Sequence, residues 1–161
     1  MTQYHNIQPV YDKNSRILIL GSFPSVKSRE AQFFYGHPQN RFWKVMSAVL
    51  DCDLPVTVQQ KKLMLLSHNI AVWDVIGSCE ITGSSDATIS SVVPNDIAGL
   101  VAETSVARIF TNGATSYNMY KRYCRDNVGI EAVKLPSTSP ANAAFSLERL
   151  ISVWKSQILS Q

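Results

Sequence analysis

The chain has 161 residues, of which 45% are hydrophobic and 17% charged, a composition typical of globular rather than disordered proteins. The net charge of +3 permits contact with a phosphate backbone but does not require it. No apolar stretch reaches the ~18 residues of a membrane span, and residues 1–8 lack the apolar core of a signal peptide. We therefore expect a single domain over residues 1–161 in an intracellular protein.

The cysteines are Cys52, Cys79 and Cys124, and no two of them form a C-x-x-C pair. Their spacing does not fit a zinc knuckle or a four-cysteine iron–sulfur site. Free thiols in a reducing compartment account for them. We expect neither a metal nor a cofactor.

The apolar residues alternate between short continuous runs, typical of strands buried on both faces, and longer runs with helical spacing. The clearest strand is the aliphatic run closed by Gly21, and Thr57 and Gln60 have the spacing of a helix capping box. In chain order, the sequence predicts a strand over 17–21, helices over 40–50 and 57–68, a strand over 70–75, a helix over 95–104, a strand over 107–111, a helix over 114–127, a strand over 131–135 and a last helix over about 142–159.

This alternation predicts an α/β fold with a parallel sheet of about four strands and helices on both faces. Ligands of such sheets bind beyond the carboxyl ends of the strands. The segments expected there are rich in Gly, Pro, Ser, Thr, Asn or Asp. They are residues 21–25, the turn after Asp74, residues 111–113 and residues 136–142.

The first of these segments is Gly21-Ser22-Phe23-Pro24-Ser25. Gly21 allows a tight turn, the amides after it can bind a ligand carbonyl, and Phe23 offers a flat face to a base. An ordinary strand-to-loop turn with a buried Phe is the alternative interpretation.

A second segment, residues 33–43, combines five aromatic side chains with His37, Asn40 and Arg41. Aromatic faces stack on bases, and an arginine can meet a phosphate. The alternatives are that the aromatics belong to the core, that Asn40 is a helix N-cap, and that His37 has a structural hydrogen bond.

The third segment, residues 135–142, holds three small hydroxyl side chains before the last predicted helix. Hydroxyls and free amides at a helix start can bind phosphate. The alternative is a capped helix start, with Ser139 as N-cap and Pro140 at the first helical position.

In this order, Gly21 to Ser25, the Tyr35-Gly36-His37-Pro38-x-Asn40-x-Phe42-Trp43 stretch and Pro136 to Asn142 resemble the hypoxanthine-DNA (deoxyinosine) glycosylase family of the uracil-DNA glycosylase superfamily. The resemblance runs from about Tyr11 to the final helix. It implies a three-layer α/β/α sandwich with a short central parallel sheet. It also implies a monofunctional, metal-independent glycosylase.

The resemblance also implies roles for single residues. Much of the superfamily places a water-positioning Asp or Asn in the first segment, which has neither here, and the catalytic Asn of the hypoxanthine family matches Asn40. The residue after the second strand is a base-reading Asn in some relatives and Asp74 here, with Asn112 as a further polar candidate. The third segment matches the part that grips the minor-groove side of DNA.

The expected site therefore has three parts. Asn40 is the candidate catalytic residue. Substrate contacts are expected from Gly21, Ser22, Phe23, Pro24, Tyr35, His37, Asp74 and Asn112. DNA contacts are expected from Arg41, Ser137, Thr138, Ser139, Pro140 and Asn142.

The expected substrate is DNA containing deoxyinosine or deoxyuridine, whose bases share a carbonyl beside an N–H. The enzyme must flip the nucleotide out of the stack, and donors aimed at the departing base stabilise its negative charge. No lysine is clearly placed as a Schiff-base nucleophile, which predicts an abasic product without strand cleavage. A monomer is expected.

Three other interpretations remain open. The same fold can act on uracil or thymine mispaired with guanine. The chain can also be a nucleic-acid-binding module with a decayed site. An unrelated nucleotide-binding domain is less favoured, because the sequence has neither G-x-G-x-x-G nor a P-loop.

Overall fold

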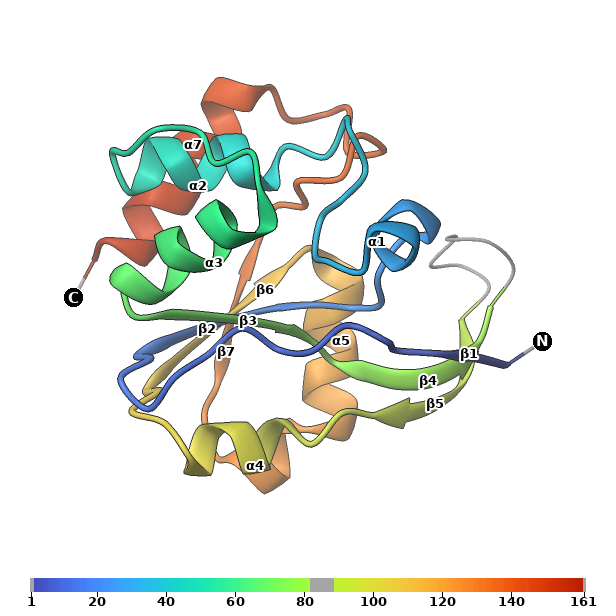
Figure 1. The fold of residues 1–161 in the computed structure, drawn as a ribbon. Helices are drawn as coiled ribbons and strands as arrows, with labels where there is room; N and C mark the ends of the chain where they lie inside the picture. Colours follow the sequence, from blue (N-terminus) through green and yellow to red (C-terminus); the bar gives the residue numbers. More distant parts are fainter. Residues whose placement is uncertain (1, 82–88, 161) are drawn as a thin grey trace.

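A parallel sheet forms the centre of the computed structural model, which describes residues 2–81 and 89–160 (Figure 1). Its strand order is β3-β2-β6-β7, and every pairing in it is parallel. The four strands predicted from the sequence are thus confirmed. They are β2 (Ile17–Gly21), β3 (Ile70–Asp74), β6 (Arg108–Asn112) and β7 (Ala132–Leu135).

Helices cover both faces of this sheet, which confirms the predicted three-layer α/β/α sandwich. One layer holds α2 (Phe42–Val49), α3 (Val58–Ser67) and α7 (Leu147–Ile158). The opposite layer holds α4 (Ile97–Ala102), α5 (Ala114–Tyr123) and α6 (Arg125–Val128). None of the helices in the described ranges is long and apolar enough to cross a membrane.

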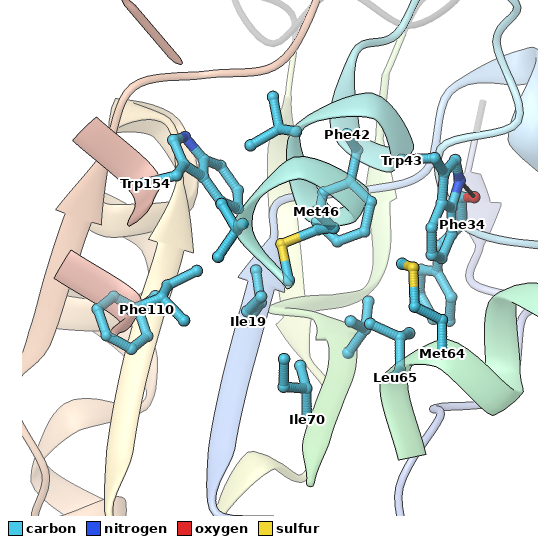
Figure 2. Close-up of a cluster of buried hydrophobic side chains, with 14 of the residues drawn as sticks. Ile19, Phe34, Phe42, Trp43, Met46, Met64, Leu65, Ile70, Phe110 and Trp154 are labelled. Carbon is cyan, nitrogen blue, oxygen red and sulfur yellow. Dashed lines mark hydrogen bonds between the residues drawn. The ribbon is translucent and has the colours of Figure 1, made fainter. Parts of the chain in front are cut away.

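The core between the sheet and the α2, α3 and α7 layer is built from large side chains (Figure 2). Ile19 and Phe110 rise from the sheet, and Met46 of α2 and Trp154 of α7 pack against them. Truncating a buried aromatic in such a core costs about 3–5 kcal/mol. This packing fixes α2 and α7, and with them the loops that precede both helices.

The aromatic second segment divides between this core and the site. Phe33, Phe34, Phe42 and Trp43 are buried, as the structural alternative predicted. The indole Nε1–H of Trp43 donates to the Phe34 carbonyl at 3.3 Å, which ties the segment to α2. Tyr35 is the aromatic of this segment that stays only partly buried.

A second, antiparallel sheet was not predicted. It contains β1 (Thr2–Tyr4), β4 (Ile76–Glu80) and β5 (Ser90–Pro94) in the order β1-β4-β5. The N-terminal segment runs antiparallel to β3 and β4. Tyr4 lies opposite Ser78 of β4, and Val10 lies opposite Val72 of β3 without a shift in the pairing. It therefore covers the outer edge of β3.

Several predicted element boundaries were wrong. The last helix begins at Leu147, because the Ser146 side chain accepts from the Arg149 N–H and is the real N-cap. Ser139 is therefore not the N-cap of α7, and the residues after it form turns. Likewise, Cys124 interrupts the helix predicted over 114–127, and α1 (Val26–Ala31) was not predicted.

Candidate active site

Three neighbouring strands, β3, β2 and β6, end at Asp74, Gly21 and Asn112. Side chains alternate along a strand, so Gly21, Asp74 and Asn112 share the face of the core residues Ile19 and Phe110. Gly21 lies opposite Asp74 in the register, and Asn112 follows the residue opposite Leu20. The two polar side chains therefore flank a position that carries none.

A cavity of about 420 Å³ opens above this edge of the sheet. It collects residues from all three sequence segments and from two further strand ends. The predicted site residues that line it are Gly21, Ser22, Phe23, Pro24, Tyr35, His37, Asn40, Asp74, Asn112, Ser137, Thr138, Ser139 and Pro140.

Gly21 makes room for the groups above it. A Cβ there would lie 2.4 Å from Asp74 Oδ1 and 3.1 Å from the Tyr35 hydroxyl. The first distance is shorter than any real contact, so a side chain would displace the carboxylate. The absence of a side chain at Gly21 is what allows Asp74 and Tyr35 to meet at the cavity floor.

Asn40 is held by hydrogen bonds that use up its carbonyl oxygen. Oδ1 accepts from the Phe42 N–H at 3.0 Å and from the Thr138 hydroxyl at 2.8 Å. Because both partners donate, the atom that they contact must be the amide oxygen of Asn40 and not its nitrogen. Among the described residues, no partner takes the Asn40 Nδ2 group, so the cavity receives two N–H donors from it.

Thr138 connects this amide to the end of β6. Its N–H donates to Asn112 Oδ1 at 3.0 Å, and its hydroxyl accepts from Asn112 Nδ2 at 2.9 Å. The residue is fully buried. Its side chain therefore orients Asn40 and Asn112, and the DNA contact expected of Thr138 stays a prediction.

Arg41, expected to contact DNA, makes internal hydrogen bonds in this structure. Its guanidinium donates to the carbonyls of Phe145, Ser139 and Asn142 at 2.5, 2.9 and 3.0 Å. Its backbone N–H donates to the Thr138 carbonyl at 3.0 Å. These hydrogen bonds brace the third segment against the start of α2.

The third segment is further fixed by its own turns. Ser137 Oγ accepts from the Ser139 N–H, and Ser139 Oγ accepts from the Ala141 N–H, both at 3.1 Å. Asn142 Nδ2 donates to the Ser137 carbonyl at 3.0 Å, an internal contact rather than an outward one. Pro140 and Ala141 are exposed at the tip.

A feature that was not predicted is the pairing of Asp74 with His5. Asp74 Oδ2 lies 2.8 Å from His5 Nε2, and both side chains are almost buried, at 5% and 3% exposure. Asp74 Oδ1 has no hydrogen-bond partner among the described residues and lines the cavity. One carboxylate oxygen is therefore used internally, and the other is available to a ligand.

Tyr35 lies between Asp74 and Asn112. Its backbone has a φ of 53°, an uncommon left-handed conformation for a side chain of this size, and its ring stacks on Phe42 at 4.0 Å between centroids. Burial and the nearby Asp74 charge raise the pKa of Tyr35, while Asn112 acts in the opposite direction. The hydroxyl therefore stays protonated at neutral pH. It is buried and has no hydrogen-bond partner among the described residues.

The loop that carries Tyr35 and His37 is anchored to α1. The Gly36 N–H donates to the buried Ser28 hydroxyl at 2.9 Å, and a Cβ at Gly36 would lie 3.2 Å from Ser28 Cα. His37 Nδ1 accepts from the Gln39 N–H at 3.1 Å, an internal turn contact. Phe23 lies on the other wall, with the Arg29 guanidinium 5.2 Å from its ring centre.

The described residues contain no group of three or more His, Cys, Asp or Glu side chains placed to hold a metal ion. The polar side chains that line the cavity are amides, hydroxyls, the Lys27 ammonium, the His37 imidazole and the Asp74 carboxylate.

Comparison with known proteins places this geometry in a family. A model described as the uracil DNA glycosylase superfamily matches residues 8–156. The chain belongs to this superfamily. The resemblance predicted from the three segments is thereby confirmed, and the matched range contains every predicted site residue.

Two similar proteins are both named hypoxanthine DNA glycosylase. The protein of Methanosarcina acetivorans is 37% identical over 141 residues, covering 87% of this chain and 89% of that protein. The protein of Methanosarcina barkeri is 34% identical over 136 residues, covering 83% and 85%. A solution NMR structure from M. acetivorans, provisionally described as a uracil DNA glycosylase, has a TM-score of 0.80 and 30% identity, covering 97% of this chain and 98% of that one.

Proposed function

We infer that the protein is a monofunctional DNA glycosylase that hydrolyses the N-glycosidic bond of a deaminated base, with hypoxanthine as the main substrate and uracil as a smaller alternative. The names of the two relatives support the reaction and the base. DNA carrying deoxyinosine or deoxyuridine is the proposed partner, and the chain is proposed to act as a single-domain monomer.

One observation carries this proposal. The cavity offers two N–H donors from Asn40 and one acceptor oxygen from Asp74, and the buried Tyr35 hydroxyl lies near the carboxylate without a hydrogen-bond partner. A flipped hypoxanthine or uracil has ring and carbonyl acceptors together with one N–H on its deaminated edge. Adenine and cytosine present an amino group and an unprotonated nitrogen there, so the Asp74 oxygen would face a lone pair.

Asn40 is better suited to the leaving base than to water. Breaking the glycosidic bond gives negative charge to the base, which N–H donors stabilise in the manner of an oxyanion hole. Activating water requires an acceptor, and the Asn40 oxygen is already taken by Thr138 and by the Phe42 N–H. We therefore assign Asn40 Nδ2 to the departing base.

The lysine at the rim does not suit covalent catalysis. Lys27 lines the cavity, but its ammonium group is mostly exposed and lies 3.8 Å from Glu30 Oε2. It is placed for a phosphate contact rather than for attack on the sugar. The proposed product is an abasic site on an intact strand, and no complex should be trapped by borohydride.

The proposal is tested with labelled duplexes that contain one deoxyinosine or one deoxyuridine. The purified protein is incubated with each, and abasic sites are then cleaved with alkali. Strand cleavage at inosine is the expected result. Cleavage at uridine alone would make the protein a uracil enzyme of the same fold, and DNA binding without cleavage of either duplex would favour a binding module.

A further inference from the structure

The His5 imidazole contacts the Asp74 carboxylate from a segment outside the range that the superfamily model matches. Its backbone N–H donates to the Gly77 carbonyl at 2.7 Å, which continues the pairing of β1 with β4. Its ring lies 6.1 Å from the rings of both Phe23 and Phe34. Backbone pairing and ring packing thus hold the imidazole beside Asp74.

The hydrogen bonds of this ring define its tautomer. Nδ1 accepts from the Ile7 N–H at 3.3 Å, so this nitrogen carries no proton. Nε2 must then carry the proton, and it donates to Asp74 Oδ2 at 2.8 Å. The ring is therefore oriented with Nε2 as the donor to the carboxylate and Nδ1 as an acceptor from the backbone.

This bond changes what the carboxylate can recognise. A free carboxylate can accept from two adjacent N–H groups at once, and guanine offers such a pair at N1 and N2. Because Oδ2 is bound to the almost buried His5 imidazole, Oδ1 is the Asp74 oxygen without a hydrogen-bond partner among the described residues. Hypoxanthine has the same carbonyl and N1–H as guanine but no N2 amino group, and so it needs only one acceptor.

We propose that His5 is a specificity-determining residue that restricts Asp74 to a single acceptor, so that the site takes hypoxanthine and rejects guanine. The inference rests on the proposed function, because it concerns the base in the same cavity. This role of His5 would explain why a cavity that accepts hypoxanthine does not release guanine, which has the same carbonyl and N1–H. Guanine in this site would bury its N2 amino group without a partner, which lowers its acceptance by roughly tenfold to a hundredfold.

Two substitutions separate the hydrogen bond from the packing. His5→Phe keeps a ring between Phe23 and Phe34 but removes the donor. His5→Gln keeps a side-chain N–H that can reach Oδ2. His68→Ala is the matched control, because His68 is an exposed histidine at the end of α3, away from the cavity. Thermal unfolding of each variant shows whether it is folded.

The first readout is single-turnover release from duplexes that contain deoxyinosine or deoxyguanosine at the same position. The second is equilibrium dialysis with radiolabelled free hypoxanthine and guanine in the presence of an abasic duplex. We expect His5→Phe to lower the preference for hypoxanthine over guanine by about tenfold or more in both readouts. The His5→Gln and His68→Ala variants should keep the preference of the parent protein.

A folded His5→Phe variant that keeps the parent preference for hypoxanthine over guanine would overturn the inference, as would equal binding of the two bases by the parent protein. Failure of the proposed function gives a different result. In that case the parent releases no base, but the dialysis still shows whether base preference depends on His5.

Discussion

The Asn40 side and the Asp74 side of the cavity each have a polar side chain that is partly occupied by internal hydrogen bonds, but the partners come from different parts of the chain. On one side, Asn40 and Thr138 come from the sequence segments that resemble the glycosylase family, and Asn112 comes from the end of β6. Their hydrogen bonds occupy the Asn40 oxygen and leave its N–H donors available. On the other side, His5 comes from the N-terminal segment and leaves only one oxygen of Asp74 available.

The difference teaches how this site obtains its selectivity. In the proposed function, selectivity comes from partners that occupy donors and acceptors on each side, because a buried group without a partner costs about 1–3 kcal/mol. We propose that the Asn40 side serves the chemistry of the leaving base and that the Asp74 side serves its recognition.

The largest effect is expected on the Asn40 side. Asn40→Ala should lower single-turnover release of hypoxanthine by roughly 10²–10³, because it removes the donors that stabilise the departing base. DNA binding, measured by fluorescence anisotropy, should change little. The matched control is Asn118→Ala, since Asn118 is exposed on α5 and does not line the cavity.

Asn40→Asp distinguishes the two roles that an asparagine can have here. If Asn40 stabilises the leaving base, a carboxylate in its place should be at least as harmful as alanine. Release at close to the parent rate in Asn40→Asp would instead assign Asn40 to activation of water.

A smaller effect is expected on the Asp74 side. Asp74→Asn allows its oxygen to accept from His5 and turns an N–H₂ group toward the base N–H, so that two donors face each other. Release of hypoxanthine should fall by roughly tenfold to a hundredfold. Asp53→Asn is the control, because Asp53 is exposed. An unchanged rate in the Asp74 variant would remove this carboxylate from base recognition.

Thr138→Val tests whether the orientation of Asn40 matters as much as its presence. Valine keeps the shape but removes the hydroxyl that joins Asn112 to Asn40. We expect a loss of about 1–3 kcal/mol in the free energy of unfolding, measured in urea, and about a tenfold lower rate of release. A stable variant with the parent rate would show that the Phe42 N–H alone holds Asn40.

The smallest effect on the reaction is expected at Arg41, which braces the third segment against the start of α2 and does not line the cavity. Arg41→Lys keeps the charge but cannot reach several carbonyls in a fixed fork, so the free energy of unfolding should fall by about 1–3 kcal/mol. The salt dependence of DNA binding should not change. Loss of about one unit of the slope of log K against log salt in Arg41→Ala would restore the phosphate role expected from the sequence.

Much of the fold and of the Asn40 side could be predicted from local patterns. Aliphatic runs that end in Gly21, Asp74 and Asn112 predict parallel strands, and the ends of neighbouring parallel strands meet at one edge of the sheet. The roles of Thr138 and Arg41 could not be predicted, because a hydroxyl and a guanidinium at a loop suit a phosphate as well as they suit an internal partner.

The sequence indicated the Asp74 side less clearly than the Asn40 side. His5 stands alone in a polar stretch, and only the long-range pairing of that stretch with β3 and β4 brings it to Asp74. Short strands without alternation are not distinguished from loops by periodicity. The start of α7 was misplaced for a related reason, because Ser139 and Ser146 offer the same capping chemistry seven residues apart.

The strand that carries His5 toward the site is only three residues long and lies at the edge of its sheet. Short edge elements open locally at a lower free energy than the whole domain unfolds. Each opening would withdraw the imidazole from Asp74 while the parallel sheet stays folded. Under the proposed role of His5, selectivity is lost at a lower temperature than the fold. The rate of amide exchange at the His5 N–H measures how often this segment opens.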